Sequence, residues 1–373
     1  MYGPAMTDTD DLLPIGLEDR LPAEARKATH AMRAALGAMD SHGYDRVRPP
    51  LIEFERSLAG RMDGVQTRRL FRFVDPESLR TLALRSDMTP QVGRIASTGL
   101  ADAPRPLRLC YAGDVATITA DQLDPARQRL QLGAELIGAD TVAAASEIVM
   151  LAVEAVEATG ARGISVDFTL PDLVDVLAAD AFALAEDRID AVRRELDTKD
   201  AGGLVAAGGE AYLPLIHAAG SLGDALAKLR ELDGGGTLAT RIEALETIAD
   251  RIGARARVTL DPTERHGFEY QSWFGFTIYA DGARGALGRG GTYWIKGSDE
   301  AATGFSLYLD ALLPALEGRE PAATVFLPLG HDPSVAARLR EEAWRTVAAL
   351  EESDDPRALG CSHRLDGSEP VAL

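Results

Sequence analysis

The sequence predicts an α+β protein built from β-hairpins, helices and one long helical insertion. Strand-like segments come in neighbouring pairs, 69–74 with 81–84 and 105–116 with 130–137, as antiparallel hairpins do. The stretch 171–250 is instead mostly helical in pattern and is broken by glycine pairs and triplets. Strands followed by a separate run of helices are typical of the α+β class.

The composition argues against two classes of partner. The chain has 373 residues, enough for two or three domains, and its 46% apolar content can form a sizeable core. With 39 basic and 58 acidic residues, the formal net charge is −19. A nucleic-acid binder needs a basic face, and anionic membrane surfaces repel an acidic protein. We therefore expect neither nucleic acid nor a membrane as partner.

The compartment follows from the cysteines and the apolar segments. Two cysteines cannot form a disulfide framework, which indicates a reducing environment. Residues 1–11 contain acids where a secretory signal would have Lys or Arg. The most apolar long stretch, 141–160, contains three glutamates and cannot span a bilayer. These features predict a soluble, cytoplasmic protein.

The N-terminal half predicts alternating helices and strands. Apolar residues at helical spacing predict a helix over 22–42 that ends at Gly43. Pro49-Pro50 keeps the next segment, 44–54, extended. The remaining expected elements are the hairpin 69–74 and 81–84, a helix over 89–98 with Pro90 in its first turn, the strands 105–116 and 130–137 around a polar arm at 117–129, and a helix over 141–158.

The C-terminal half predicts further strands and then a small remnant. We expect strands at 164–170, 257–260, 270–279 and 283–287, a turn at Gly288-Arg-Gly-Gly291, and a helix over 304–316. After the linker-like residues 317–321 come one strand, 324–329, one helix, 334–351, and a polar, irregular end. The expected domains are a core over 12–320 and a vestigial segment over 321–373, which is too small to fold alone and should dock on the core or on a partner.

Several polar fragments are candidates for a site, although each has an ordinary structural reading. Asp87 and Thr89 follow a predicted strand and could cap the next helix or hold an ammonium group. Gln131 and Glu135 lie on one face of a strand, which is typical of a polar pocket. The glycines at 288–291 lack the spacing of known phosphate loops. None of these fragments identifies a reaction by itself.

Metal and cofactor motifs are absent from the sequence. The histidines, at 30, 42, 217, 266, 331 and 363, form no close pair with metal-ligand spacing, and the two cysteines stand alone. We expect neither a metal nor a cofactor.

In order and spacing, the fragments together resemble the catalytic domain of class II histidyl-tRNA synthetases over residues 12–316. Gly43-Tyr-Asp-Arg-Val-Arg-Pro-Pro50 is similar to motif 1 of that family, which lies at the dimer interface. Leu84-Arg-Ser-Asp-Met-Thr89, Gln131-Leu-Gly-Ala-Glu135 and Gly290-Gly-Thr-Tyr293 are similar to three further segments, and Leu260-Asp-Pro to the start of the histidine-specific loop. The resemblance implies a class II antiparallel sheet flanked by helices.

The departures from the synthetase pattern concern its catalytic cations. The motif 2 arginine and glutamate fall on Thr117 and Thr119, and the motif 3 arginine falls on Ala311. The arginine of the histidine loop falls on His266, and its second tyrosine on Gln271. Each lost charge-stabilising donor costs about 100-fold or more in rate. We therefore expect no synthetase activity.

A synthetase-like fold without these cations resembles the regulatory subunit of ATP phosphoribosyltransferase, a synthetase paralogue. Phe71-Arg-Phe-Val-Asp-Pro-Glu-Ser78 and Tyr111-Ala-Gly-Asp114 are particularly similar to that family. The resemblance implies a noncatalytic chain that pairs with a short-form catalytic subunit in the first step of histidine biosynthesis. It also implies a homodimer within a hetero-octamer, and feedback control by histidine.

The resemblance also implies a histidine pocket. Its tentative residues are Asp87, Thr89, Gln131, Glu135, His266 and Tyr270. The ligand's ammonium group would meet the first three, and Glu135 would accept a hydrogen bond from its imidazole.

Two alternatives remain open at the level of sequence. A divergent amino-acid ligase would need replacement cations, for which Arg127, Arg129 and Arg289 are candidates. A stress-kinase-type sensor that binds uncharged tRNA is disfavoured by the net charge of −19.

Overall fold

The computed structural model describes residues 12–59, 70–118, 125–265, 271–317 and 323–373. The chain forms two compact units, Met1–Leu316 and Glu317–Leu373. Among the described residues, no helix is both long and apolar enough to cross a membrane.

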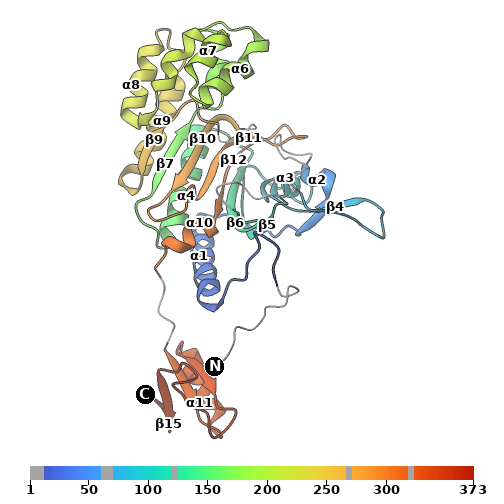
Figure 1. Cartoon of the computed structure of the whole chain (residues 1–373), viewed down its shortest axis with the longest axis vertical. Helices are drawn as coiled ribbons and strands as arrows, with labels where there is room; N and C mark the ends of the chain where they lie inside the picture. Colours follow the sequence, from blue (N-terminus) through green and yellow to red (C-terminus); the bar gives the residue numbers. More distant parts are fainter. Residues whose placement is uncertain (1–11, 60–69, 119–124, 266–270, 318–322) are drawn as a thin grey trace, which may run out of the picture. The chain divides into compact units, whose positions relative to one another are not determined.

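The larger unit is built on a nine-stranded sheet whose central strands are antiparallel (Figure 1). Its order is β1-β5-β6-β12-β11-β10-β7-β9-β8. The bounds are β1 Asp45–Arg46, β5 Leu107–Ala116, β6 Gln128–Ile137, β7 Ser165–Thr169, β8 Gly220–Ser221, β9 Arg257–Leu260, β10 Gln271–Tyr279, β11 Gly288–Trp294 and β12 Ala301–Tyr308. This is the sheet that the synthetase resemblance implies.

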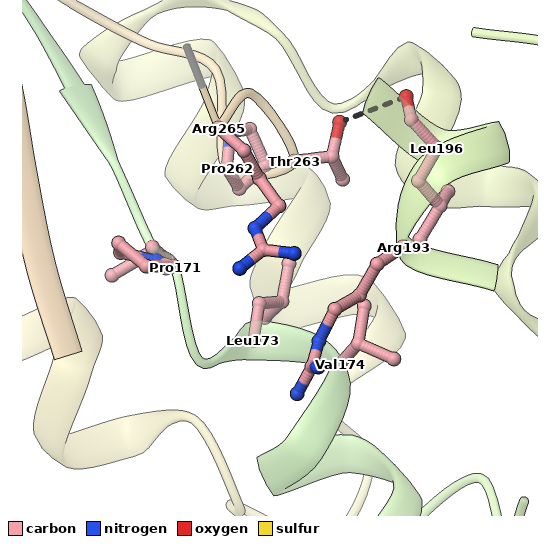
Figure 2. A pocket seen from close by; sticks show the side chains of 9 residues that line it. Pro171, Leu173, Val174, Arg193, Leu196, Pro262, Thr263 and Arg265 are labelled. Carbon is pink, nitrogen blue, oxygen red and sulfur yellow. Dashed lines mark hydrogen bonds between the residues drawn. The ribbon is translucent and has the colours of Figure 1, made fainter. Parts of the chain in front are cut away.

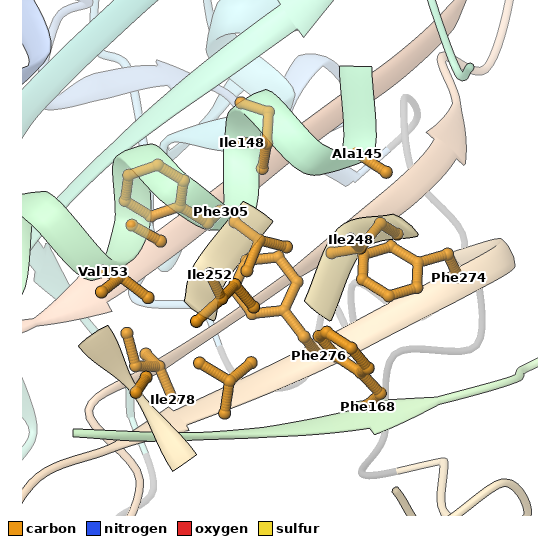
Figure 3. Packing of buried hydrophobic residues seen from close by; sticks show 14 of the residues in the cluster. Ala145, Ile148, Val153, Phe168, Ile248, Ile252, Phe274, Phe276, Ile278 and Phe305 are labelled. Carbon is orange, nitrogen blue, oxygen red and sulfur yellow. The ribbon is translucent and has the colours of Figure 1, made fainter. Parts of the chain in front are cut away.

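Helices cover one face of this sheet and enclose the main core. Helix α4 (Val142–Ala158) packs on β6, β10, β11 and β12, and it also packs on α1 (Pro22–Ser41) and α9 (Ala239–Ile252). Phe168, Phe274 and Phe276 project into this layer, with ring centroids 5.3 Å apart for Phe168–Phe274 and 5.9 Å apart for Phe274–Phe276. Figure 3 shows them against Ile148 and Ile248. Burial of this apolar face fixes the strand register, because a slip by one residue would turn it outward.

The opposite face of the sheet has a smaller apolar cluster and a set of polar side chains. Helix α3 (Thr89–Ser97) contributes Val92 and Ala96 to that cluster. A three-stranded sheet of order β2-β4-β3 precedes α3 in the chain. Its strands are β2 Ile52–Phe54, β3 Arg72–Val74 and β4 Thr81–Leu84, and the short helix α2 spans Glu55–Ala59.

The predicted helical insertion connects β7 to β9. It contains α5 Leu173–Ala179, α6 Glu186–Asp197, α7 Ala201–Ala206, the 3-10 helix Glu210–His217, α8 Leu222–Leu232 and α9. Figure 1 shows α6 to α9 grouped together beyond β7 and β9. The glycines at 208–209 and 234–236 separate short helices as predicted, whereas the expected break at 202–203 is wrong, because those two glycines lie inside α7.

Three predictions for the region 283–316 are wrong. The glycines 288–291 form strand β11 rather than a turn, and the strand expected at 283–287 is absent. Residues 301–308 form strand β12 rather than helix, followed by the short helices α10 (Leu309–Leu312) and Leu313–Ala315. A short apolar run buried on both faces has no period that separates strand from helix.

The smaller unit also differs from the prediction. Its sheet has the order β14-β13-β15-β16, with β13 Thr324–Leu327, β14 Arg345–Ala348, β15 His363–Asp366 and β16 Glu369–Ala372. The helix expected over 334–351 is α11 Pro333–Glu341, which ends before Ala343, where φ is 66°. The end of the chain is therefore folded rather than irregular, and the unit has its own small core around Val325 and Leu339.

Gly304, at the centre of the sheet, gives a test of how closely the strands pack. Gly304 faces Glu135 across the ladder, and a Cβ there would lie 1.7 Å from a carboxylate oxygen of Glu135. Gly304→Ala should therefore destabilise the chain by about 1–3 kcal/mol in denaturant unfolding. Gly37→Ala is the matched control, because Gly37 lies in exposed helix with open space around it. It should stabilise by roughly 0.5–1 kcal/mol. Equal effects at both positions would contradict the packing argument.

Candidate functional site

Strand register places a row of polar side chains along the face of the sheet opposite α4. Tyr111 on β5 pairs with Gly133 on β6, which pairs with Ser306 on β12. The same row continues through three further strands to Arg289 on β11, Thr277 on β10 and Asp167 on β7. Because side chains directly opposite one another share a face, the row forms one continuous polar strip.

At one end of the strip, Gln131 joins the sheet to the start of α3. Its Nε2 donates to Asp87 Oδ1 at 2.8 Å and to Ser306 Oγ at 2.8 Å. Its Oε1 accepts from the backbone N–H of Met88 at 2.9 Å. Asp87 also accepts from the backbone N–H of Thr89 at 2.9 Å. Of the two roles weighed from sequence, the structure shows the first, because Asp87 accepts from a backbone amide at the start of α3; the role in holding an ammonium group stays a prediction.

The neighbouring carboxyl group of Glu135 is buried among hydroxyl groups. Its Oε1 accepts from Tyr111 at 3.1 Å and its Oε2 from Tyr293 at 2.7 Å. Tyr111 also lies 2.9 Å from Ser306 Oγ and 3.1 Å from Thr89 Oγ1. Burial raises the pKa of Glu135 to about 8, against the lowering effect of the two tyrosine hydrogen bonds. Burial also raises the pKa of Tyr111. Near neutral pH, the carboxyl group of Glu135 can therefore hold a proton or accept one from a bound ligand.

A buried arginine supports the segment that precedes this cluster. Arg85 donates from Nε to the carbonyl of Asp114 at 2.8 Å and from a terminal nitrogen to that of Pro49 at 2.9 Å. Gln91 donates to the carbonyl of Pro50 at 2.7 Å. The extended Pro49-Pro50 segment is thereby tied to both β5 and α3, on either side of Asp87.

The other end of the strip is acidic. Thr259 donates to Asp167 at 2.7 Å, and Lys199 pairs with Asp261 at 2.7 Å. Burial, together with the charges of Asp167 and Asp261, raises the pKa of Glu264 to about 7. The pKa of Asp167 is raised by the same cause, burial.

Between the two ends lie Tyr308 and two arginines. The guanidinium of Arg129 lies 5.5 Å from the centroid of the Tyr308 ring. Burial raises the pKa of Tyr308, while the charges of Arg129 and Arg289 oppose that rise. The middle of the strip is thus cationic and is flanked by acidic groups on either side.

Four of the six predicted ligand residues come together in the structure: Asp87, Thr89, Gln131 and Glu135 are linked through the hydrogen bonds above. His266 and Tyr270 lie outside the described residues, as does Thr119. The prediction missed Tyr111, Tyr293 and Ser306. Both tyrosines stand inside quoted motifs and could have been found there, whereas Ser306 was hidden by the wrong helix prediction.

Comparisons with known proteins identify the family of the chain. The family model described as histidyl-tRNA synthetase matches residues 16–312. ATP phosphoribosyltransferase regulatory subunits from Paramagnetospirillum magneticum and Rhodospirillum centenum are each 41% identical to this chain. The first match covers 95% of this chain and 96% of the relative, and the second covers 95% of each.

Solved structures show the same fold. A protein described as an ATP phosphoribosyltransferase regulatory subunit/histidyl-tRNA synthetase from Bacillus halodurans matches with a TM-score of 0.80 at 24% identity, over 96% of this chain and 97% of that one. Histidyl-tRNA synthetase from Nostoc sp. PCC 7120 matches with a TM-score of 0.77 at 17% identity, over 95% and 90%. By fold and by near full-length sequence similarity, the chain belongs to the family of ATP phosphoribosyltransferase regulatory subunits, which share the fold of histidyl-tRNA synthetases.

Proposed function

We propose that this chain is the noncatalytic subunit that a short-form ATP phosphoribosyltransferase catalytic subunit requires for activity, and that it brings histidine feedback to that enzyme. The observation that supports this most directly is the similarity to regulatory subunits over almost the whole length of both chains. We extend the proposal to assembly, as a homodimer through the motif 1 segment, 43–50, within a hetero-octamer.

The surroundings of the former catalytic positions support a noncatalytic role. The backbone N–H of Thr117 donates to the carbonyl of Arg127, and Ala311 packs against the main core. Beside Ala311, Asp310 pairs with Arg20 and accepts from the backbone N–H of Leu130 at 2.7 Å. Neither Thr117 nor Ala311 has a positively charged side chain that could stabilise a transferring phosphate.

The polar strip supports a histidine pocket at its tyrosine-lined end. An ammonium group would meet Asp87, Thr89 and Gln131, which already exchange hydrogen bonds there. An imidazole N–H would donate to Glu135, whose two tyrosine partners fix the position of its carboxyl group. For the ligand's carboxylate we propose Arg289, which pairs across the ladder with Ser306 and supplies a cation on the same face.

Binding at this position would bias the conformation of α3. Gln131 and Thr89 hold the first turn of that helix, and Arg85 and Gln91 connect it to Pro49-Pro50. A ligand that replaces some of these hydrogen bonds would favour one position of α3 over another. Coupling of about 1–3 kcal/mol is typical of such regulation.

The activity of a complex tests the proposed function. A short-form catalytic subunit from the same organism should form phosphoribosyl-ATP much faster with this chain than without it, and added histidine should lower that rate. The rate is followed spectroscopically, and sizing chromatography reports the complex. An unchanged rate and separate elution would reject the proposal. Amino-acid-dependent ATP–pyrophosphate exchange by this chain alone would instead favour the divergent ligase.

Calorimetric titration of histidine tests the pocket. Gln131→Ala should weaken histidine binding about tenfold or more, because it removes two hydrogen bonds beside the ammonium site. Gln128→Ala is the matched control, since Gln128 is exposed on the same strand. Equal affinity in both variants would place histidine elsewhere.

The dependence of stability on pH tests the buried carboxyl group. The folded chain holds a proton on Glu135 up to about pH 8, whereas the unfolded chain loses it near the ordinary value of 4.5. This group should therefore lower the free energy of unfolding as pH rises from 5 to 8, by at most about 1.4 kcal/mol per pH unit.

In the Glu135→Gln variant the free energy of unfolding should not fall in this way as pH rises. The effect is measured by urea unfolding, as the difference in free energy of unfolding between the variant and the unmodified chain at each pH. In Glu147→Gln the dependence should be retained, because Arg108 lowers the pKa of Glu147 and its contribution is constant above pH 5. If the difference in free energy of unfolding between Glu135→Gln and the unmodified chain did not change with pH, Glu135 would be ionised in the folded chain.

A further inference from the structure

Polar side chains at the tyrosine-lined end of the strip form a hydrogen-bond chain with a fixed direction. The Oε1 atom of Gln131 accepts from the backbone N–H of Met88, so its Nε2 is the atom that donates to Ser306 at 2.8 Å. Ser306 Oγ accepts there and has its single hydrogen left for Tyr111 at 2.9 Å. Tyr111 in turn donates to Glu135 at 3.1 Å. Every hydrogen bond in the chain therefore points toward Glu135.

A second phenol makes Glu135 an acceptor at both of its oxygens. Tyr293 donates to Oε2 at 2.7 Å, while Tyr111 donates to Oε1. Glu135 is 1% exposed, and burial raises its pKa to about 8 although both hydrogen bonds lower it. Near neutral pH the carboxyl group thus carries a proton that neither phenol needs for its own hydrogen bond. That proton can pass to a base that binds beside it.

Titratable groups on three elements face Glu135: Tyr111 on β5, Tyr293 on β11 and Asp87 ahead of α3. The charge of Asp87 raises the pKa of Glu135, because a second negative charge nearby disfavours ionisation. A ligand that brings an ammonium group to Asp87 would neutralise that charge. Loss of the repulsion, together with a cationic ring next to Glu135, favours the ionised carboxylate.

The acids at the other end of the strip lie too far away to act on Glu135. Asp167 is on β7, four strands from β6, which is roughly 19 Å at the usual strand spacing. Asp261 lies one strand further, in a loop that is fixed to α6. Thr263 Oγ1 donates to the carbonyl of Leu196 there at 3.5 Å (Figure 2), and Lys199 pairs with Asp261. The proton balance of Glu135 is therefore local.

The strands beside Glu135 provide a floor for a flat ring. Gly304 pairs with Glu135 across the ladder, Gly291 pairs with Gly304, and Gly275 pairs with Gly291. Three neighbouring strands thus contribute no side chain in this row, over roughly 10 Å at the usual strand spacing. A planar heteroaromatic ring can lie against such a floor with a ring nitrogen directed at the carboxyl group.

We propose that Glu135 gives its proton to the ring of bound histidine, so that the pocket holds an imidazolium beside a carboxylate and selects ligands by the basicity of the ring. Transfer of this kind rests on the proposed function, in which the imidazole meets Glu135. An N–H bond forms on the ring as the O–H bond of the carboxyl group breaks, and near neutral pH no proton is exchanged with solvent. Tyr111 and Tyr293 are positioning residues, because they hold the carboxylate that remains.

The ion pair makes this transfer favourable. The ordinary pKa of an imidazole is about 6.5, below the pKa of Glu135 in the chain by itself. An opposite charge at contact distance typically lowers the pKa of a carboxyl group by about 1–3. The imidazolium is therefore sufficient to reverse the order of the two pKa values. The carboxylate then accepts from two phenols and from the ring N–H, and charge strengthens each of these hydrogen bonds.

Nitrogen NMR of ring-labelled histidine, bound to the full-length chain near neutral pH, tests the proton transfer. Both ring nitrogens should carry hydrogen, so their chemical shifts should lie close together, as in an imidazolium ion. A neutral ring would give two widely separated shifts, and that result would reject the transfer while leaving the histidine pocket intact. Absence of histidine binding would reject the pocket and the transfer together.

The dependence of histidine affinity on pH gives an independent test. The complex holds one proton, whereas below the pKa of the free imidazole both partners hold one, and above the pKa of Glu135 neither does. Affinity should therefore be highest between about pH 6.5 and 8, and should fall up to about tenfold per pH unit on either side. The analogue 2-fluorohistidine, whose ring is a far weaker base, should bind about tenfold or more weakly. Equal affinity for both ligands would contradict selection by basicity.

Three variants separate proton transfer from packing. In Glu135→Gln the site has no proton to give, so histidine should bind about tenfold or more weakly and no better than 2-fluorohistidine. Tyr293→Phe removes one donor to the carboxylate and should move the upper limit of the pH range to higher pH. Glu147→Gln is the matched control, because Glu147 also accepts from a buried tyrosine but lies on α4, outside the strip. It should bind histidine as the unmodified chain does. Unchanged histidine affinity in Glu135→Gln would show that the proposal is wrong.

Discussion

The difference between the two faces of the central sheet determines most of this structure. One face of β5, β6, β12, β11 and β10 is apolar and is covered by α4 and α1, which fixes the register of every strand. Once the register is fixed, the alternate residues of the same strands must line up on the other face. Tyr111, Ser306, Arg289 and Asp167 are therefore neighbours although they are far apart in sequence.

Close packing limits what that polar face can contain. Gly133 faces Tyr111 and Gly304 faces Glu135, and in both places a Cβ would meet the neighbouring side chain within 2.6 Å. The glycines thus leave the space in which a carboxyl group and two phenols can be buried together. A group with the raised pKa of Glu135 exists only because its surroundings exclude water so fully.

Sequence patterns predicted the hairpins and the insertion, because alternation and helical spacing are local signals. They also singled out four polar residues that lie together in the structure. They failed where burial on both faces removes the alternation, as in β12, and where glycines serve packing rather than turning, as in β11. Resemblance to a family supplied Asp87 and Gln131 as partners, which spacing could not.

The insertion has a topological role that its position in the chain conceals. Strands β7 and β9 are parallel neighbours, so a tight turn cannot join them and a crossover of a dozen or more residues is required. The helices between Leu173 and Ile252 supply that crossover, and short β8 adds one further strand beside β9. Relatives could therefore shorten or elaborate this region freely, down to about a single helix, while the sheet and its polar strip stayed in place. Complete loss of the region would disconnect the edge of the sheet.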